Sequence, residues 1–194
     1  MEINIEEKVN MKRLFIVLIS FLAVSINSFA QEIQTRFLGL TMGEEYTFNA
    51  RESRIGEYIF EKKEKGKYLG TDIRFGGCNW DFVWISLFNK HNTPNQGKFY
   101  QIEFECYFED EQEAKDMANA LHDSLSSKYG DGEFEKKEND RYGTAKWYGS
   151  NNMTCRLSIS YSKSKGGDMY YYVDLFYCDI ALFLEQGASE YDEL

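Results

Sequence analysis

The fold is decided by residues 100–129, which read YQIEFECYFEDEQEAKDMANALHDSLSSKY. Apolar and polar side chains alternate over the first nine residues, a pattern typical of a strand with one buried and one solvated face. Beyond them the apolar residues recur at spacings of three and four, which places Ala114, Leu121 and Leu125 on one side of a helix. We therefore predict an α+β fold in which this helix, residues 110–129, packs on one face of an antiparallel β-sheet.

A second hairpin follows the helix, with strands predicted at residues 153–161 and 169–178. The turn between them contains Gly166 and Gly167, which tolerate positive φ. Slipping the register by one residue would bring the Asp174 carboxylate to the buried face, which is strongly unfavourable. The predicted register therefore pairs apolar side chains: Tyr161 with Tyr171, Ile159 with Val173, Leu157 with Leu175 and Cys155 with Tyr177.

Three further strands are predicted ahead of these elements, at residues 56–63, 67–76 and 80–89. The polar stretch 89–98 holds the only proline and is predicted to be a surface loop. Strands on either side of the long helix have similar patterns, which indicates two copies of a helix followed by three antiparallel strands. In this interpretation the first helix is degraded and lies within residues 43–54. The alternative is that two unrelated sets of amphipathic strands look alike.

The N-terminus has the pattern of a secretory signal. A run over residues 14–24 that is apolar except for Ser20 follows two basic residues, and residues 28–30 read Ser-Phe-Ala, an A-x-A-like cleavage site. The run is shorter than the roughly 20 residues that span a bilayer. We therefore expect translation to start at Met11 and residues 1–30 to be removed. Residues 31–194 should then form a single exported domain, periplasmic or extracellular, without stable membrane insertion.

The charge of the chain bears on its partners. The sequence has 32 acidic and 22 basic residues and a net charge of −10. Nucleic acids and anionic lipids need clustered Lys and Arg to neutralise their phosphates, and an acidic balance of this size argues against both. The acidic residues are spread along the chain, as on an ordinary solvated surface. Composition therefore argues against a nucleic-acid partner and favours a basic or neutral one.

All four cysteines, Cys78, Cys106, Cys155 and Cys178, lie in the predicted mature chain. An exported protein meets an oxidising compartment, so we expect two disulfides. Four cysteines allow three connectivities, and the sequence does not choose among them. Cys106 and Cys155 fall on inward faces of predicted strands, which favours pairing them with each other and Cys78 with Cys178.

Few residues could carry acid–base or metal chemistry. His91 and His122 are the only histidines, and neither has a marked partner for nucleophilic catalysis. No two cysteines lie within four residues of each other and no phosphate-binding glycine motif occurs, so we expect no catalytic triad, no metal site and no cofactor. Paired carboxylates remain as an enzymatic option, because a glycan hydrolase can work with two acids alone.

Three short glycine-containing motifs resemble those of small exported bacterial domains of unknown function: Phe37-Leu38-Gly39-Leu40-Thr41-Met42-Gly43, Arg74-Phe75-Gly76-Gly77 and Lys128-Tyr129-Gly130. The doubled plan of a helix and three strands is similar to that of the β-lactamase-inhibitor protein and of the small outer-membrane assembly lipoproteins. The resemblance covers most of residues 36–180 and implies a binding or envelope-assembly role without catalysis. The chain lacks the acylated cysteine of the lipoproteins, and no functional residue is carried over.

Aromatic residues make up 16% of the chain, and the last predicted strand places Tyr170, Tyr172 and Phe176 opposite its buried side chains. If the helix covers only one face of the sheet, these rings are exposed, as in protein- or sugar-binding surfaces. The alternative is that segments near the two ends of the mature chain cover them. We name these three aromatics, together with His91 in the loop, as candidate ligand-binding residues.

The sequence thus predicts a secreted or periplasmic, non-catalytic interaction domain that binds a protein or glycan through an exposed sheet face or the loop 89–98. The alternative hypothesis is an envelope-localised glycan hydrolase that uses carboxylates. A flat aromatic face would favour binding, whereas a concave pocket with two facing acids would favour the enzyme.

Overall fold

The computed structural model describes residues 31–90, 92–136 and 143–187. The predicted signal, residues 1–30, lies outside this description and stays a prediction. The described residues from Glu32 onward belong to one compact unit. Its elements are, in chain order, β1 (Arg36–Phe37), β2 (Leu40–Thr41), β3 (Glu52–Ile55), β4 (Tyr58–Glu64), β5 (Lys67–Phe75), β6 (Cys78–Leu87), β7 (Phe99–Phe108), α2 (Glu111–Tyr129), β8 (Glu133–Lys136), β9 (Gly143–Tyr148), β10 (Met153–Lys163), β11 (Met169–Asp179) and α3 (Ile180–Gln186).

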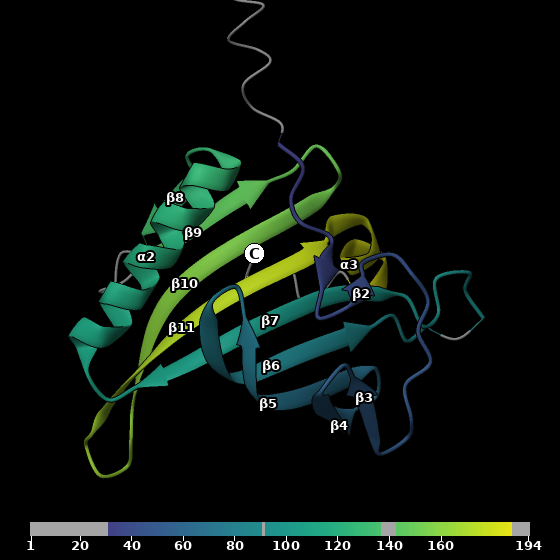
Figure 1. The fold of residues 1–194 in the computed structure, drawn as a ribbon, viewed down its shortest axis with the longest axis horizontal. Coiled ribbons are helices and arrows are strands. Elements are labelled where there is room, and N and C mark those ends of the chain that lie inside the picture. Colours follow the sequence, from purple (N-terminus) through teal and green to yellow (C-terminus); the bar gives the residue numbers. More distant parts are fainter. Residues whose placement is uncertain (1–30, 91, 137–142, 188–194) are drawn as a thin grey trace, which may run out of the picture. The chain divides into compact units, whose positions relative to one another are not determined.

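Nine of the described strands form one antiparallel sheet in the order β3-β4-β5-β6-β7-β11-β10-β9-β8 (Figure 1). Two meanders build it: β3–β7 run from one edge toward the middle, and β8–β11 run from the other edge. The helix α2 connects the two meanders, so that β7 and β11 lie side by side at the centre. Strands β1 and β2 form a separate two-stranded sheet. The predicted α+β class with an antiparallel sheet is confirmed.

The predicted register of the hairpin β10–β11 is confirmed in all four pairs: Tyr161 with Tyr171, Ile159 with Val173, Leu157 with Leu175 and Cys155 with Tyr177. Tyr161 is 39% exposed, and the other side chains belong to the core under α2 or pack against it. Asp174 points to the other face, where it lies opposite Ser158. This outcome follows from the cost of placing a carboxylate in an apolar core.

The long helix α2 lies across one face of the sheet and packs on β7, β10 and β11 (Figure 1). At its start the Asp110 carboxylate accepts a hydrogen bond of 2.8 Å from the N–H of Gln112 and so caps the first turn. The helix ends at Gly130, whose φ of 82° is readily adopted only by glycine. Ala114 and Leu125 are buried against the sheet. The predicted helix is therefore confirmed, with its predicted apolar side facing the strands.

The degraded helix predicted within residues 43–54 is not formed. This segment instead runs along the start of β7 and the loop before it. The N–H of Gly43 donates to the Phe99 carbonyl at 2.8 Å, and the N–H of Tyr46 donates to the Gly97 carbonyl at 2.9 Å. These bonds satisfy the backbone in an extended form, which removes the need for a helical ladder. The strand order fits a repeat in which β5, β6 and β7 correspond to β9, β10 and β11. The prediction of a helix in the first copy was wrong.

Hydrophobic side chains gather in two clusters, one on each face of the sheet. The larger lies between the sheet, α2 and the N-terminal segment, where the Phe37 and Tyr177 ring centroids are 4.6 Å apart. The smaller lies on the opposite face under α3 and consists of Phe88, Tyr100, Phe176, Cys178, Leu182 and Phe183. Asp179 begins α3 by accepting a hydrogen bond of 3.1 Å from the N–H of Leu182. The short helix α3 therefore covers part of the face that α2 leaves open.

The predicted disulfides are wrong, because all four cysteines are free thiols. Cys106 lies on β7 and Cys155 on β10, and β11 runs between these two strands. Two strand spacings of about 4.8 Å therefore separate their Cα atoms, which is more than the roughly 7 Å that a disulfide can bridge. Cys178 pairs with Gln101 of β7, which in turn pairs with Ser86 near the end of β6. Cys78 lies at the start of β6, so the Cys78 and Cys178 thiols lie level with opposite ends of that strand and cannot form a disulfide. The export prediction therefore rests on the leader pattern alone.

Candidate functional site

The face of the sheet opposite α2 is named the open face. Its central side chains come from four neighbouring strands: Phe82 and Trp84 of β6; Glu103, Glu105 and Tyr107 of β7; Tyr170, Tyr172, Asp174 and Phe176 of β11; and Arg156 and Ser158 of β10. The helix α3 covers one end of this face. The other end carries aromatic side chains that stay partly exposed.

Two of the predicted ligand-binding residues, Tyr170 and Tyr172, lie together at this exposed end. Both rings contact Tyr107 of β7, with centroid distances of 5.2 Å to Tyr170 and 6.0 Å to Tyr172. The Ser162 hydroxyl donates to the Tyr172 hydroxyl at 3.1 Å and holds that ring in place. Tyr107 is 37% exposed and was not named from the sequence. The alternation of residues 100–108 places Tyr107 on the outward face, and this pattern could have identified it as a candidate.

The other two predicted residues do not join this patch. Phe176 is only 3% exposed, because it packs against Phe183 of α3 with ring centroids 6.2 Å apart. The sequence left open that the C-terminal tail covers part of this face, and α3 does so at Phe176. His91 lies outside the described residues.

Three carboxyl groups lie next to one another on the open face. Glu105 of β7 lies directly opposite Asp174 of β11, and Glu103 lies opposite Phe176, two residues along each strand. Like charges that face each other across antiparallel strands repel. The Arg156 guanidinium carbon lies 4.7 Å from the centre of the Phe176 ring and brings one positive charge to this cluster. The sequence showed each acid on an outward face but not that β7 and β11 are neighbours.

This arrangement changes the acidity of the cluster. Burial, together with repulsion from Glu103 and Glu105, raises the pKa of Asp174 to about 7, while Arg156 and the Ser158 hydroxyl act in the opposite direction. Burial also raises the pKa of Glu103 and of Glu105. Asp174 therefore changes between its neutral and charged forms near pH 7, and the charge of the open face changes with it.

A groove of about 740 Å³ lies on the open face at its exposed end. It is lined by Thr71, Asp72, Asp81, Phe82, Glu105, Tyr107 and Tyr172. The Asp81 carboxylate accepts a hydrogen bond of 2.8 Å from the N–H of Tyr107, so this wall is tied to β7. Three acids and three aromatic rings line the groove, and none of its lining residues is basic. Such walls suit a positively charged group, which gains from both the carboxylates and the ring faces.

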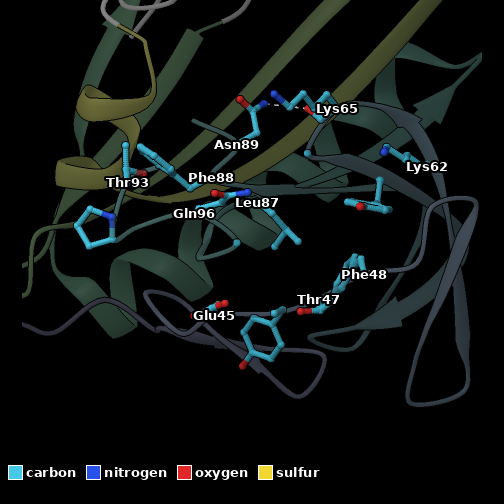
Figure 2. Close-up of a pocket in the computed structure, with 15 residues that line it drawn as sticks. Glu45, Thr47, Phe48, Lys62, Lys65, Leu87, Phe88, Asn89, Thr93 and Gln96 are labelled. Atoms are coloured by element: carbon cyan, nitrogen blue, oxygen red, sulfur yellow. Dashed lines mark hydrogen bonds between the residues drawn. The ribbon is translucent and has the colours of Figure 1, made fainter. Parts of the chain in front are cut away.

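A second cavity lies at the predicted loop 89–98 and is named the loop pocket (Figure 2). Its volume is about 550 Å³. Four parts of the chain line it: Glu45, Tyr46, Thr47 and Phe48; Lys62, Lys65, Gly66 and Tyr68; Leu87, Phe88 and Asn89; and Thr93, Pro94, Gln96 and Gly97. In Figure 2, Glu45, Thr47 and Phe48 lie on one side, and Lys65 and Asn89 lie on the other. The predicted loop thus forms one wall of a cavity, and nothing in the sequence indicated the other walls.

Hydrogen bonds from α3 fix this wall. The Gln186 amide donates to the Asn89 side-chain oxygen at 2.9 Å and accepts from the Asn89 N–H at 3.1 Å. The Asn89 side chain in turn donates to the Lys65 carbonyl at 2.9 Å, which links the loop to the β4–β5 hairpin. Asn95 donates to the Glu185 carboxylate at 2.7 Å. The loop pocket is therefore held open by bonds among three separate segments.

The described residues hold neither a cluster of metal ligands nor a helix that could cross a membrane. Within residues 31–90, 92–136 and 143–187, no group of three or more His, Cys, Asp and Glu is placed to hold a metal ion. In the same part of the chain no helix is both long and apolar enough to cross a bilayer. Comparisons with known protein families, curated proteins and solved structures found no match.

Proposed function

We propose that the chain is an exported, non-catalytic interaction domain that binds a basic segment of a partner protein through the open face. The proposal is carried by the groove in which Phe82, Tyr107 and Tyr172 stand beside Asp81 and Glu105. Phe82 and Tyr107 are each 37% exposed, although they are large apolar rings on a regular sheet. Aromatic side chains of this kind give much contact area for little loss of conformational entropy.

The charge of the groove supports a basic partner rather than a neutral one. All of its charged lining residues are acidic, and the chain as a whole carries a net charge of −10. Such a field attracts a basic segment over several ångströms and speeds its encounter with the sheet. A lysine or arginine above a tyrosine ring adds a cation–π contact. A neutral glycan could use the rings but would gain nothing from the carboxylates, so it is the competing ligand.

One observation favours the alternative function, a carboxylate-based glycan hydrolase. Glu105 and Asp174 face each other, and the pKa of Asp174 is about 7. Many glycosidases use one ionised and one protonated carboxyl group. Asp174 does not line the groove that Glu105 lines, so the two carboxyl groups do not converge on one cavity. For this reason we rank binding above hydrolysis.

The binding proposal is tested by fluorescence anisotropy with a labelled ten-residue oligolysine peptide. We expect saturable binding to the purified protein, with no binding of the matching oligoglutamate peptide. Tyr107→Ala should weaken binding about tenfold, as for a central aromatic contact. Tyr161→Ala is the matched control, because Tyr161 is 39% exposed but points to the other face of the sheet. Equal loss in both variants, or equal binding of the two peptides, would refute the proposal.

Two further measurements test its remaining parts. Mass spectrometry of the native product should find an N-terminus at Gln31, and a product that begins at Met1 or Met11 would contradict export by cleavage. Release of reducing sugar from envelope polysaccharides should be absent. If hydrolysis occurs and both Glu105→Gln and Asp174→Asn abolish it, the enzymatic alternative replaces the binding proposal.

A further inference from the structure

We propose that the loop pocket binds an acidic sugar, that is, a pyranose ring that carries a carboxylate. The loop pocket shares no lining residue with the groove on the open face, so this site is independent of the protein-binding surface proposed above. Its volume of about 550 Å³ lies within the range of small-molecule sites. Three features of its walls carry the proposal: a tyrosine hydroxyl that opens on the cavity, an apolar ring and a positive charge.

The hydroxyl belongs to Tyr68, which lines the pocket and is 5% exposed as a whole residue. Among the described residues, no hydrogen bond reaches this hydroxyl, and it is not among the fully buried polar atoms without a partner, so it opens on the cavity. The hydroxyl of Tyr46, which also lines the pocket, is already engaged: it accepts from the N–H of Thr41 at 2.8 Å and donates to the Glu44 carboxylate at 2.9 Å. The Tyr68 hydroxyl is therefore the tyrosine donor that a ligand oxygen in the cavity can use.

The apolar ring is that of Phe48. It packs edge-on against Tyr68, with ring centroids 4.8 Å apart and planes at 73°, so its position is fixed before any ligand arrives. Figure 2 shows Phe48 on the wall beside Thr47. The C–H face of a pyranose packs on such rings, as apolar surface does generally. Thr47, Thr93 and Asn89 line the same pocket and offer donors and acceptors for ring hydroxyls.

The positive charge comes from Lys62, which lies directly opposite Tyr68 in the β4–β5 pairing. Side chains paired in this way leave the sheet on the same face with Cβ atoms about 5 Å apart. A carboxylate bound to the Lys62 ammonium is therefore within reach of the Tyr68 hydroxyl. No ion pair joins Lys62 to another residue of the described chain.

The charge of the whole pocket agrees with this assignment. Its charged lining residues are Lys62, Lys65 and Glu45, so the walls carry net positive charge. The chain as a whole has a net charge of −10. A locally positive cavity in an acidic protein favours an anionic ligand over a neutral one. The sugar ring can pack on the Phe48 ring and bond the Asn89 amide, and the carboxylate can pair with a lysine ammonium group.

Titration calorimetry with three related probes separates these contributions. D-Glucuronate has both the ring and the carboxylate, D-glucose has the ring alone, and D-gluconate has a carboxylate on an open chain. We expect saturable binding of D-glucuronate and at least tenfold weaker binding of the other two. Trigalacturonate, used in parallel, distinguishes a free sugar from the end of a polysaccharide: whichever of the two binds more tightly identifies the source.

Two variants and one control test the assigned residues. Lys62→Gln should weaken D-glucuronate about tenfold and leave D-glucose unchanged, because only the charged contact is lost. Tyr68→Phe removes the hydroxyl alone and should weaken D-glucuronate about fivefold while leaving D-glucose unchanged, with the fold checked by circular dichroism. Lys63→Gln is the matched control, since Lys63 is the next residue of β4 and forms its ion pair with Glu61 at 2.7 Å.

The proposal is overturned by any of three results. Neither D-glucuronate nor trigalacturonate binds; or D-gluconate binds as tightly as D-glucuronate, which removes the sugar ring from the account; or Lys63→Gln weakens binding as much as Lys62→Gln. The proposal for the open face survives all three, because oligolysine binding is measured on a different set of residues.

Discussion

Asp174 of β11 lies directly opposite Glu105 of β7 at the centre of the sheet. Two acids in this position repel each other when both are ionised. Burial, together with repulsion from Glu103 and Glu105, raises the pKa of Asp174 to about 7, although Arg156 and Ser158 act in the opposite direction. The burial and pairing of Asp174 therefore cost stability at and above neutral pH, which is consistent with a surface kept for binding rather than for folding.

The first prediction concerns the pH dependence of stability. Asp174 has a pKa of about 7 in the folded chain against an ordinary value of 3.8, so between these values the folded state binds more protons than the unfolded state. The free energy of unfolding should fall as the pH rises from about 4 to about 7. Asp174→Asn should remove most of this fall and be more stable than the wild type at pH 8 by about 2 kcal/mol, below the roughly 4 kcal/mol ceiling that the full shift sets.

Urea unfolding at pH 5 and pH 8 measures this effect. Asp123→Asn is the control, because the Asp123 side chain on α2 is 88% exposed and should leave the pH dependence unchanged. The groups that face Asp174, namely Glu103, Glu105, Arg156 and Ser158, remain in the variant and account for any residual slope. Loss of stability with pH in Asp174→Asn as steep as in the wild type would contradict the prediction.

The second prediction concerns the helix α3. Phe183 is 7% exposed, and its ring centroid lies 6.2 Å from those of both Tyr100 and Phe176. Phe183→Ala should lower the free energy of unfolding by about 3 kcal/mol, because it removes a large buried ring and leaves a cavity. The neighbouring Leu184 is 52% exposed, so Leu184→Ala should change stability by less than about 0.5 kcal/mol. Similar losses in the two variants would show that α3 does not pack as described.

The third prediction concerns Gly66 at the rim of the loop pocket. Gly66 has a φ of 78°, and an added Cβ would lie 2.6 Å from the Leu87 carbonyl oxygen. Gly56 has a φ of 59° with nothing within 4 Å of the same position. Gly56→Ala should therefore cost about 1 kcal/mol from backbone strain alone, whereas Gly66→Ala should cost at least twice that, because backbone atoms must move. Equal thermal shifts for the two variants would disprove the close approach.

The fourth prediction concerns the thiols. Burial raises the pKa of Cys106 to about 11 and the pKa values of Cys155 and Cys178 to about 12, so these thiols stay protonated and unreactive in the folded protein. Cys78 is the only one that is partly exposed. Ellman's reagent should label at most one thiol per native chain, and four in denaturant without a reducing agent. Labelling of fewer than four thiols in denaturant would show that the native chain contains a disulfide.

Much of the fold could be predicted from local patterns. The alternation at residues 100–108 and 153–161 identified strands and their faces, and the position of Asp174 set the β10–β11 register because a carboxylate avoids an apolar core. The helix within residues 43–54 was wrong, since extended pairing with residues before and within β7 satisfies that backbone instead. The predicted pairing of Cys106 with Cys155 was wrong for a related reason. Both residues face the core, but burial does not show which strands are neighbours in the sheet.

The candidate sites were predictable only in part. Tyr170 and Tyr172 were identified as outward-facing, but the tyrosine that completes their patch, Tyr107, is brought to them by the pairing of β7 with β11. The resemblance to inhibitor and envelope-assembly domains stays a prediction, as does export. The loop 89–98 was identified as a surface element without any sign of the cavity behind it.

By itself the sequence determined which face of β7, β10 and β11 is buried and where the long helix begins and ends, because side-chain periodicity and capping act over a few residues. Only the tertiary structure decided that Glu105 faces Asp174, that α3 buries Phe176, and that Phe48, Lys62 and Tyr68 line one pocket. These contacts join residues far apart in the chain, and they depend on strand order and on the close packing of distant segments, which no local pattern encodes.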